Sequence, residues 1–153
     1  MPVVPMEELA ALPEASVLMG LDVGSKTLGV AVSDAGWAFA HPRAVIERTR
    51  FAEDWAKLSG AIDAEGAAAL VVGLPLNMNG TLGPSGQAAK AFVANVLRRR
   101  DLPVAFWDER LSTVAAERAM VSADVSRARR ARRIDSAAAA FILQGALDRL
   151  VAL

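Results

Sequence analysis

The stretch VLMGLDVGSKTLGVAVSD (residues 17–34) places an acid and several glycines between two apolar runs. Residues 17–23 and 28–34 have the apolar character of buried strands, and the turn beginning at Gly24 separates them. Strands this close in sequence are expected to pair in antiparallel fashion. Asp22 is unusual inside such a run. It either bonds the backbone of the turn or brings a carboxylate to the edge of the core.

The rest of the chain alternates strand and helix patterns. Residues 37–48 predict a third strand, in which Pro42 implies an edge position or a break. Further segments follow in chain order: an amphipathic helix over 51–66 ended by Gly66, a strand over 68–76, a loop, a helix from Pro84 to Arg100, a strand over 103–107, a helix capped by Ser112 or Thr113, a polar arginine-rich connection and a long final helix over 134–153. The expected fold class is α/β, with a mixed five-stranded sheet flanked by helices.

Composition places the chain among globular proteins. Its 153 residues are 54% apolar and 22% charged, which suits one domain with a substantial core. Residues 1–16 carry three acids, no basic side chain and no run long enough for a signal peptide or membrane span. We therefore expect an N-terminal extension over 1–16, a single domain over 17–153 and a cytoplasmic location. The lack of cysteine fits that location and excludes thiolate metal sites.

Charge is unevenly distributed, although the formal net charge is zero. Residues 98–133 hold ten arginines against five acids, and SRARRARR (residues 126–133) contains five of those arginines. Such a local basic stretch is typical either of a nucleic-acid contact or of a solvated helix face.

Three acidic positions fall where chemistry is expected. The strand ending at Trp107 is followed by Asp108 and Glu109, of which at most one is expected to point into a shared site. Asp135 precedes an apolar helical run, where a helix cap is the simpler explanation. Proteins with such sheets bind ligands at the carboxyl ends of the strands, where Asp22, the pair Asp108–Glu109 and the loop over 73–83 are all expected.

A cluster of carboxylates implies a hard cation, because the charges would otherwise repel one another. Mg²⁺ or Mn²⁺ takes oxygen ligands, and two such ions can stabilise the attacking and leaving oxygens of a phosphodiester cleavage. The single histidine, His41, precedes a proline at a strand end and makes a zinc site or a histidine-based triad improbable.

Four blocks of sequence carry a family resemblance: GLDVGSKTLGVAVSD (20–34), VVGLPLNMNGT (71–81), DERLST (108–113) followed by AE, and RRIDSAAAAFILQ (132–144). In this order they resemble the YqgF family of pre-16S rRNA nucleases, also called Holliday-junction-resolvase-like proteins. The resemblance covers about residues 17–151 and implies a ribonuclease H-like fold. It also implies that Asp22, Glu109 and Asp135 are the catalytic, metal-binding acids. The family's usual basic residue after GSK is Thr27 here.

Other residues are candidates for substrate contact, each with a structural alternative. Gly24 permits a tight turn, and Lys26 either meets a phosphate or is solvated. Asn77 and Asn79 either orient a sugar-phosphate or only shape their loop, and Arg110 either clamps a phosphate or pairs with an acid. The arginines of residues 126–133 are candidates for backbone contact: Arg129, Arg130, Arg132 and Arg133.

These observations favour a metal-dependent nuclease acting on structured nucleic acid, and the resemblance points to the 5′ end of pre-16S rRNA. A Holliday-junction resolvase acting on DNA would use the same site as a dimer. Two further alternatives are a small actin-like nucleotide-binding domain and a non-catalytic nucleic-acid-binding factor. The expected partner is nucleic acid, either pre-rRNA or branched DNA, with no membrane contact and a monomeric or homodimeric protein.

Overall fold

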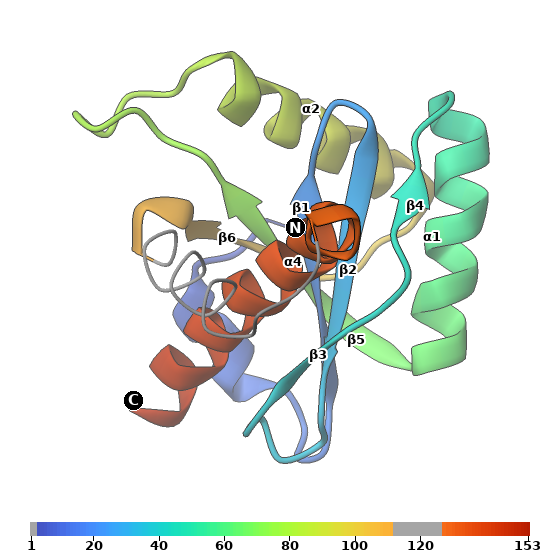
Figure 1. The fold of residues 1–153 in the computed structure, drawn as a ribbon. Coiled ribbons are helices and arrows are strands. Elements are labelled where there is room, and N and C mark those ends of the chain that lie inside the picture. Colours follow the sequence, from blue (N-terminus) through green and yellow to red (C-terminus); the bar gives the residue numbers. More distant parts are fainter. Residues whose placement is uncertain (1–2, 112–126) are drawn as a thin grey trace.

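The computed structural model describes the backbone of residues 3–111 and 127–153, and the side chains of residues 3–111 and 137–153 (Figure 1). Its elements are, in chain order, η1 (Met6–Ala11), β1 (Val17–Val23), β2 (Thr27–Ser33), β3 (Ala40–Pro42), β4 (Ile46–Glu47), α1 (Phe51–Glu65), β5 (Ala67–Leu74), α2 (Pro84–Arg99), β6 (Val104–Asp108), η2 (Glu109–Leu111) and α4 (Arg127–Val151).

The strands form one mixed sheet in the order β3-β2-β1-β5-β6, with β4 also paired to β2. Pairing is antiparallel between β1 and β2 and parallel from β1 to β5 and from β5 to β6, as predicted. The expected number of five strands is wrong, because residues 37–48 form two short strands, giving a six-stranded sheet. β3 ends at Pro42, the Arg43 backbone N–H still donates to the Val30 carbonyl oxygen of β2 at 2.7 Å, and the chain pairs with β2 again at Ile46.

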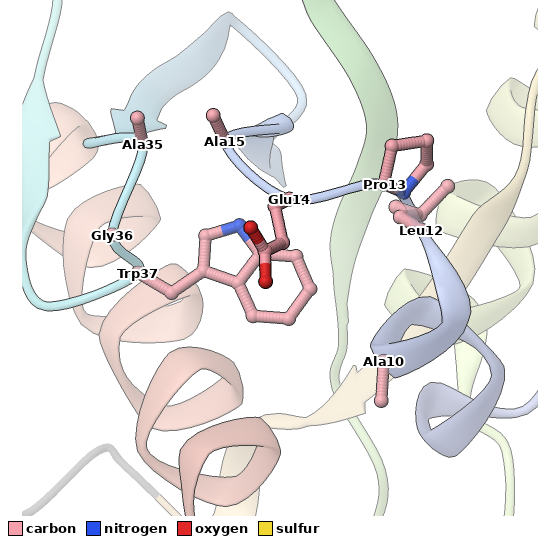
Figure 2. Close-up of a pocket in the computed structure, with 8 residues that line it drawn as sticks. All are labelled: Ala10, Leu12, Pro13, Glu14, Ala15, Ala35, Gly36 and Trp37. Carbon is pink, nitrogen blue, oxygen red and sulfur yellow. The ribbon is translucent and has the colours of Figure 1, made fainter.

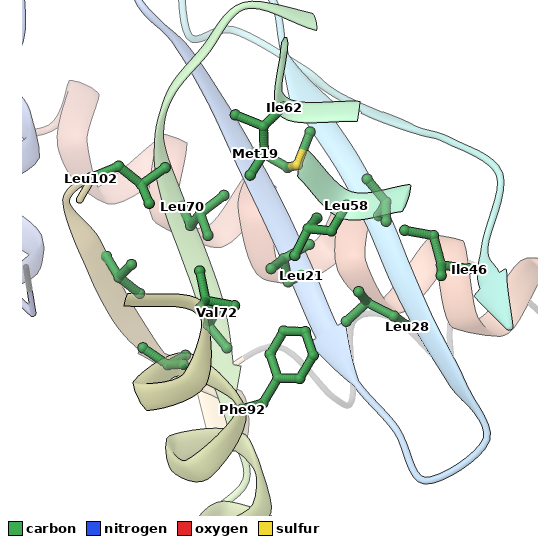
Figure 3. Close-up of a cluster of buried hydrophobic side chains, with 14 of the residues drawn as sticks. Met19, Leu21, Leu28, Ile46, Leu58, Ile62, Leu70, Val72, Phe92 and Leu102 are labelled. Carbon is green, nitrogen blue, oxygen red and sulfur yellow. The ribbon is translucent and has the colours of Figure 1, made fainter. Parts of the chain in front are cut away.

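One face of the sheet packs on α1 and α2. Figure 3 shows its large apolar side chains, which come from the sheet, from α1 and from α2 and pack against one another. Leu21, Leu58, Ile62 and Leu70 are each at most 1% exposed. This cluster accounts for the amphipathic pattern of residues 51–66, and Gly66 ends α1 in the left-handed conformation as predicted.

The other face packs on α4 and is lined by smaller residues. A Cβ at Gly20 would lie 2.7 Å from Leu143 Cβ and 2.9 Å from the Ala139 carbonyl oxygen. A glycine in β1 therefore lets the α4 backbone approach the sheet closely. Figure 1 shows α4 crossing this face of the sheet.

The start of α4 differs from the prediction. The arginine-rich segment was expected to be a connection, but residues 127–133 form the first turns of the helix. Arginine and alanine both favour helix, so the polar character of SRARRARR did not mark a break. The helix capped by Ser112 or Thr113 lies outside the described residues.

The N-terminal segment docks on the body of the protein. Leu9 of η1 is 1% exposed and belongs to the α4-side core. The Val4 backbone N–H donates to the Val104 carbonyl oxygen at 2.9 Å, which attaches the segment beside β6. In the described part of the chain, no helix is both long and apolar enough to cross a membrane.

Candidate active site

Asp22 lies near the carboxyl end of β1, on the face that α4 covers. Alternation along the strand sets this orientation, since Leu21 belongs to the α1/α2 core whereas Leu18 and Gly20 contact the α4 side. Asp22 pairs across the hairpin with Gly29 and is half-buried. The carboxylate is thus carried to the edge of the core by a strand of otherwise apolar residues.

Glu109 begins η2 directly after β6, and its side chain lies over Gly73 of β5. A Cβ at Gly73 would stand 3.0 Å from Glu109 Cδ and 2.5 Å from Ile142 Cδ1 of α4. β5 is the strand between β1 and β6, and Leu21 of β1 pairs with Val72, the residue before Gly73. The lack of a side chain at Gly73 therefore leaves room for the Glu109 side chain on the strand that separates β1 from β6.

The environment of Glu109 favours its neutral form. Burial, followed by the charges of Asp22 and Asp108, raises the pKa of Glu109 to about 7. Because the charge of Asp22 contributes to this raised pKa, each of the two carboxylates, 87 residues apart in sequence, disfavours the ionised form of the other. A bound cation would relieve this repulsion.

Asp108 faces away from this pair, which decides between the two adjacent acids. It follows Phe106, which packs on the α1/α2 side, whereas Trp107 packs against the α4-side core. Its carboxylate accepts hydrogen bonds from Arg110 Nε at 3.0 Å and Nη2 at 2.7 Å. These bonds hold the pKa of Asp108 below its usual value.

Asp135 lies within α4, eight residues after the helix begins at Arg127. The helix-cap alternative is therefore wrong, because a capping residue stands at the first turn. The Asp135 side chain is outside the described residues. Among the side chains that are described, no three acids or histidines form a group able to hold a metal.

The turn after Asp22 is fixed by an arginine that the sequence did not single out. Arg48 Nη1 donates to the Gly24 carbonyl oxygen at 2.6 Å, and the Arg48 backbone N–H donates to the Lys26 carbonyl oxygen at 2.9 Å. The Arg48 guanidinium lies 5.3 Å from the Phe92 ring centroid and 3.7 Å from the buried Asp54 carboxylate. Lys26 itself is exposed. No local sequence pattern marks this contact, since it joins residues 24 positions apart.

The candidate amides of the β5–α2 loop are bonded within the loop. Asn77 Nδ2 donates to Thr81 Oγ1 at 2.9 Å, and Asn79 Oδ1 accepts from Thr81 Oγ1 at 2.6 Å and from its backbone N–H at 3.1 Å. The structure thus supports the loop-shaping role for both asparagines, which are exposed. The side chains of Arg129, Arg130, Arg132 and Arg133 lie outside the described residues.

A family model described as "RuvX: Holliday junction resolvase" matches residues 16–149, nearly the whole chain. The chain belongs to this family. The match includes β1, η2 and most of α4, which carry Asp22, Glu109 and Asp135.

Relatives and structural neighbours of this RuvX-family chain are nucleases by name or share its fold. Proteins named "Putative pre-16S rRNA nuclease" are 58% identical, one from Brucella anthropi over 98% of this chain and 92% of its own, and one from Chelativorans sp. (strain BNC1) over 100% and 96%. Thermus thermophilus RuvC in complex with a Holliday junction substrate has a TM-score of 0.58 at 17% identity, covering 90% of this chain and 96% of RuvC. That likeness confirms the ribonuclease H-like α/β fold.

The pocket in Figure 2 is remote from the acids of the RuvX-family chain. It has a volume of about 450 Å³ and is lined by residues that precede β1 and follow β2, among them Glu14, Ala15 and Trp37. Because β1 and β2 are antiparallel, this is the end of the hairpin opposite Asp22. Glu14 is its one charged lining residue, so the pocket does not offer the donor set of a phosphodiester site.

The residues at the carboxyl ends of β1 and β6 suit a divalent metal ion. Asp22 and Glu109 present carboxylate oxygens, the ligands that Mg²⁺ prefers, and their mutual repulsion favours a cation between them. The space over Gly73 would be filled by any larger side chain.

Proposed function

We propose that this protein is a metal-dependent nuclease that hydrolyses phosphodiester bonds of structured RNA. The observation that carries the proposal is the position of Glu109 over Gly73, where burial and the charge of Asp22 raise its pKa to about 7, at the carboxyl end of a ribonuclease H-like sheet. The nuclease domain spans residues 17–153, with residues 1–16 as an extension attached to it.

Asp22, Glu109 and Asp135 would hold the metal, either Mg²⁺ or Mn²⁺. Asp135 precedes Ala139 by four residues and Ile142 by seven, the helical spacing of the stripe that packs on the sheet. This spacing supports a place for Asp135 on the face of α4 that meets the sheet. The metal would activate water and stabilise the charge that develops on the phosphate. The carboxylates would hold the metal in place, and Gly73 leaves room for the Glu109 side chain.

The basic start of α4 would supply sequence-independent affinity for the phosphate backbone. Arg129, Arg130, Arg132 and Arg133 lie in the helix that also carries Asp135. Arginines there would neutralise phosphates near the scissile bond. Each such contact would add roughly −0.7 to the slope of the logarithm of the binding constant against the logarithm of the salt concentration, for single strands. Lys26 lies at the hairpin turn beside Asp22 and would add a further contact.

The preferred substrate is the 5′ end of pre-16S rRNA, cleaved in the cytoplasm by a monomer or homodimer. The names of relatives at 58% identity over nearly their whole length support this choice. The second candidate is resolution of four-way DNA junctions, which the family description and the RuvC neighbour favour. A resolvase would act as a dimer, because a symmetric junction requires two cuts.

The test uses purified full-length protein with matched precursor rRNA and four-way DNA substrates, with Mg²⁺ or Mn²⁺ and with chelator. We expect cleavage of the RNA that stops in chelator. Faster cleavage of the junction, at symmetric positions, would assign the resolvase function instead. Cleavage of either substrate at full rate in chelator would overturn the metal-dependent mechanism.

A further inference from the structure

Arg110 connects two segments at the edge of the proposed active site. Its guanidinium forms the fork with Asp108 described above, and its third nitrogen, Nη1, donates to the Met78 carbonyl oxygen at 3.2 Å. Met78 is at the tip of the β5–α2 loop, whereas Asp108 ends β6. The arginine therefore spans from β6 to a loop 32 residues earlier in sequence.

The loop tip has little else to hold it. The Met78 side chain is 90% exposed, so apolar packing does not anchor it. The loop is closed at its base by the bridge between Leu76 and Leu82, and it is bonded internally through Asn77 and Thr81. Within the residues that the structure describes, the hydrogen bond from Arg110 is the one that joins the tip to another element.

Asp108 orients both the arginine and the start of η2. Its Oδ1 accepts from the Arg110 backbone N–H at 3.0 Å as well as from Nε at 3.0 Å. This backbone bond closes a turn around Glu109, which lies between the two residues in the chain. Asp108 and Arg110 thus tie the loop tip to the backbone that carries Glu109.

We propose that Asp108 and Arg110 form a latch that positions the β5–α2 loop beside the active site, so that Arg110 is a positioning residue rather than a phosphate clamp. Two of its guanidinium nitrogens are already bonded to Asp108 and the third to the loop. The effect on substrate rests on the proposed nuclease function. The effect on the loop does not.

The first experiment measures hydrogen exchange of loop amides in the protein without substrate. The Asn77 and Gly80 backbone N–H groups donate to the carbonyl oxygens of Thr81 and Asn77. Arg110→Ala and Asp108→Asn should each speed exchange of these amides up to about fivefold, as expected of an exposed ion pair. The double variant should equal the single ones, because both remove one latch.

Arg98→Ala is the matched control. Arg98 is an exposed arginine whose Nη1 bonds Asn95 of the same helix at 3.2 Å, so exchange in the loop should not change. Unchanged loop exchange in Arg110→Ala overturns the latch. Faster loop exchange in Arg110→Ala together with an unchanged rate in Asp108→Asn would also overturn it, since Asp108 would then not be needed to hold the loop.

The second experiment measures cleavage kinetics as a function of salt, with each variant at its optimal pH. A latch predicts that Arg110→Ala and Asp108→Asn raise KM by the same factor, with an unchanged salt slope and no rescue by Arg110→Lys. A phosphate clamp predicts a slope reduced by roughly 0.7 in Arg110→Ala alone and substantial rescue by Arg110→Lys. That second pattern would contradict the latch. A loss of all cleavage in the parent would refute the proposed function while the exchange result still stood.

Discussion

The two faces of the sheet differ in the size of their side chains and in the location of the candidate catalytic acids. The face toward α1 and α2 carries large aliphatic and aromatic side chains that pack against one another (Figure 3), beside the ion pair of the buried Asp54 with Arg48. The face toward α4 carries alanines and close-packed glycines. Asp22 and Glu109 lie on this side, at the carboxyl ends of β1 and β6. Large side chains contribute most of the burial, whereas small ones let a helix and two acids approach the same strands. The first face is expected to govern stability and the second to govern activity.

The largest expected effect comes from the acids of the α4 face. Asp22→Asn and Glu109→Gln should each lower kcat/KM for cleavage by more than about 100-fold, since even the loss of a group that orients a metal ligand costs about 10–100-fold. Without metal, both variants should be at least as stable as the parent, because each removes one of two repelling charges. Cleavage of labelled RNA and thermal unfolding measure the two effects.

The control for these variants is Asp63→Asn, which neutralises an exposed carboxylate of α1 that pairs with Arg100. It should retain full activity. If Asp22→Asn or Glu109→Gln also cleaved at the parental rate, the acids of the α4 face would not be catalytic.

The opposite face is tested by Leu58→Ala. Leu58 of α1 is 0% exposed, and its truncation should lower the free energy of unfolding by about 2–5 kcal/mol. Activity per folded molecule should not change, because this side chain packs on the face of the sheet opposite Asp22 and Glu109. Leu153→Ala, at a leucine that is 61% exposed, is the control and should have little effect on unfolding. A specific activity that fell with Leu58→Ala would show that the two faces are not separable.

Gly73→Ala sharpens the comparison, because it should affect both properties. The added methyl group would press on Ile142 and Glu109, at a cost of about 1–3 kcal/mol and with loss of cleavage. Gly60→Ala in α1 meets no atom within 4 Å and should stabilise by about 0.5–1 kcal/mol, since alanine favours a helix. Denaturant unfolding measures both. A Gly73→Ala protein with parental stability and activity would show that the space over Gly73 is not needed.

A smaller effect is expected from pH. The pKa of Glu109 is raised from 4.5 to about 7, so the folded metal-free protein favours the protonated acid. The associated stability is present below about pH 4.5 and is lost as the pH rises through about 7. Relative to Glu109→Gln, the parent should lose on the order of 1 kcal/mol over this range, allowing for solvent screening. Unfolding of both proteins between pH 4 and 8 checks the sign; a difference that is independent of pH would contradict it.

Local patterns predicted most of the fold. Helical spacing with Gly66, and Pro84 at the first position of α2, located the two helices because these signals act within a few residues. The division of residues 37–48 into β3 and β4 could not be predicted, since it depends on which parts of β2 are available for pairing. The start of α4 was missed because arginine-rich sequence occurs in both helices and connections.

The site was only partly predictable. Asp22 stood out as an acid in an apolar run, Glu109 came from the resemblance, and in the structure the charge of Asp22 helps to raise the pKa of Glu109. The residues alone left Glu109 and Asp108 open, and the family resemblance selected Glu109; the alternation along β6 agrees with that choice. The role of Gly73 could have been suggested by a glycine in a buried strand. Arg48 gave no such signal, because its bond to Gly24 crosses between distant segments.

The most direct test of a metal site between β1 and β6 is a titration of the folded protein with Mn²⁺. The electron paramagnetic resonance signal of free Mn²⁺ measures how much of the ion stays unbound. The parent should bind Mn²⁺, and Asp22→Asn and Glu109→Gln should lose most of this binding. Asp108→Asn removes the same charge from the residue next to Glu109, but that side chain faces Arg110, so binding should persist. Equal Mn²⁺ binding by the parent, Asp22→Asn and Glu109→Gln, or no binding by the parent, would contradict the account.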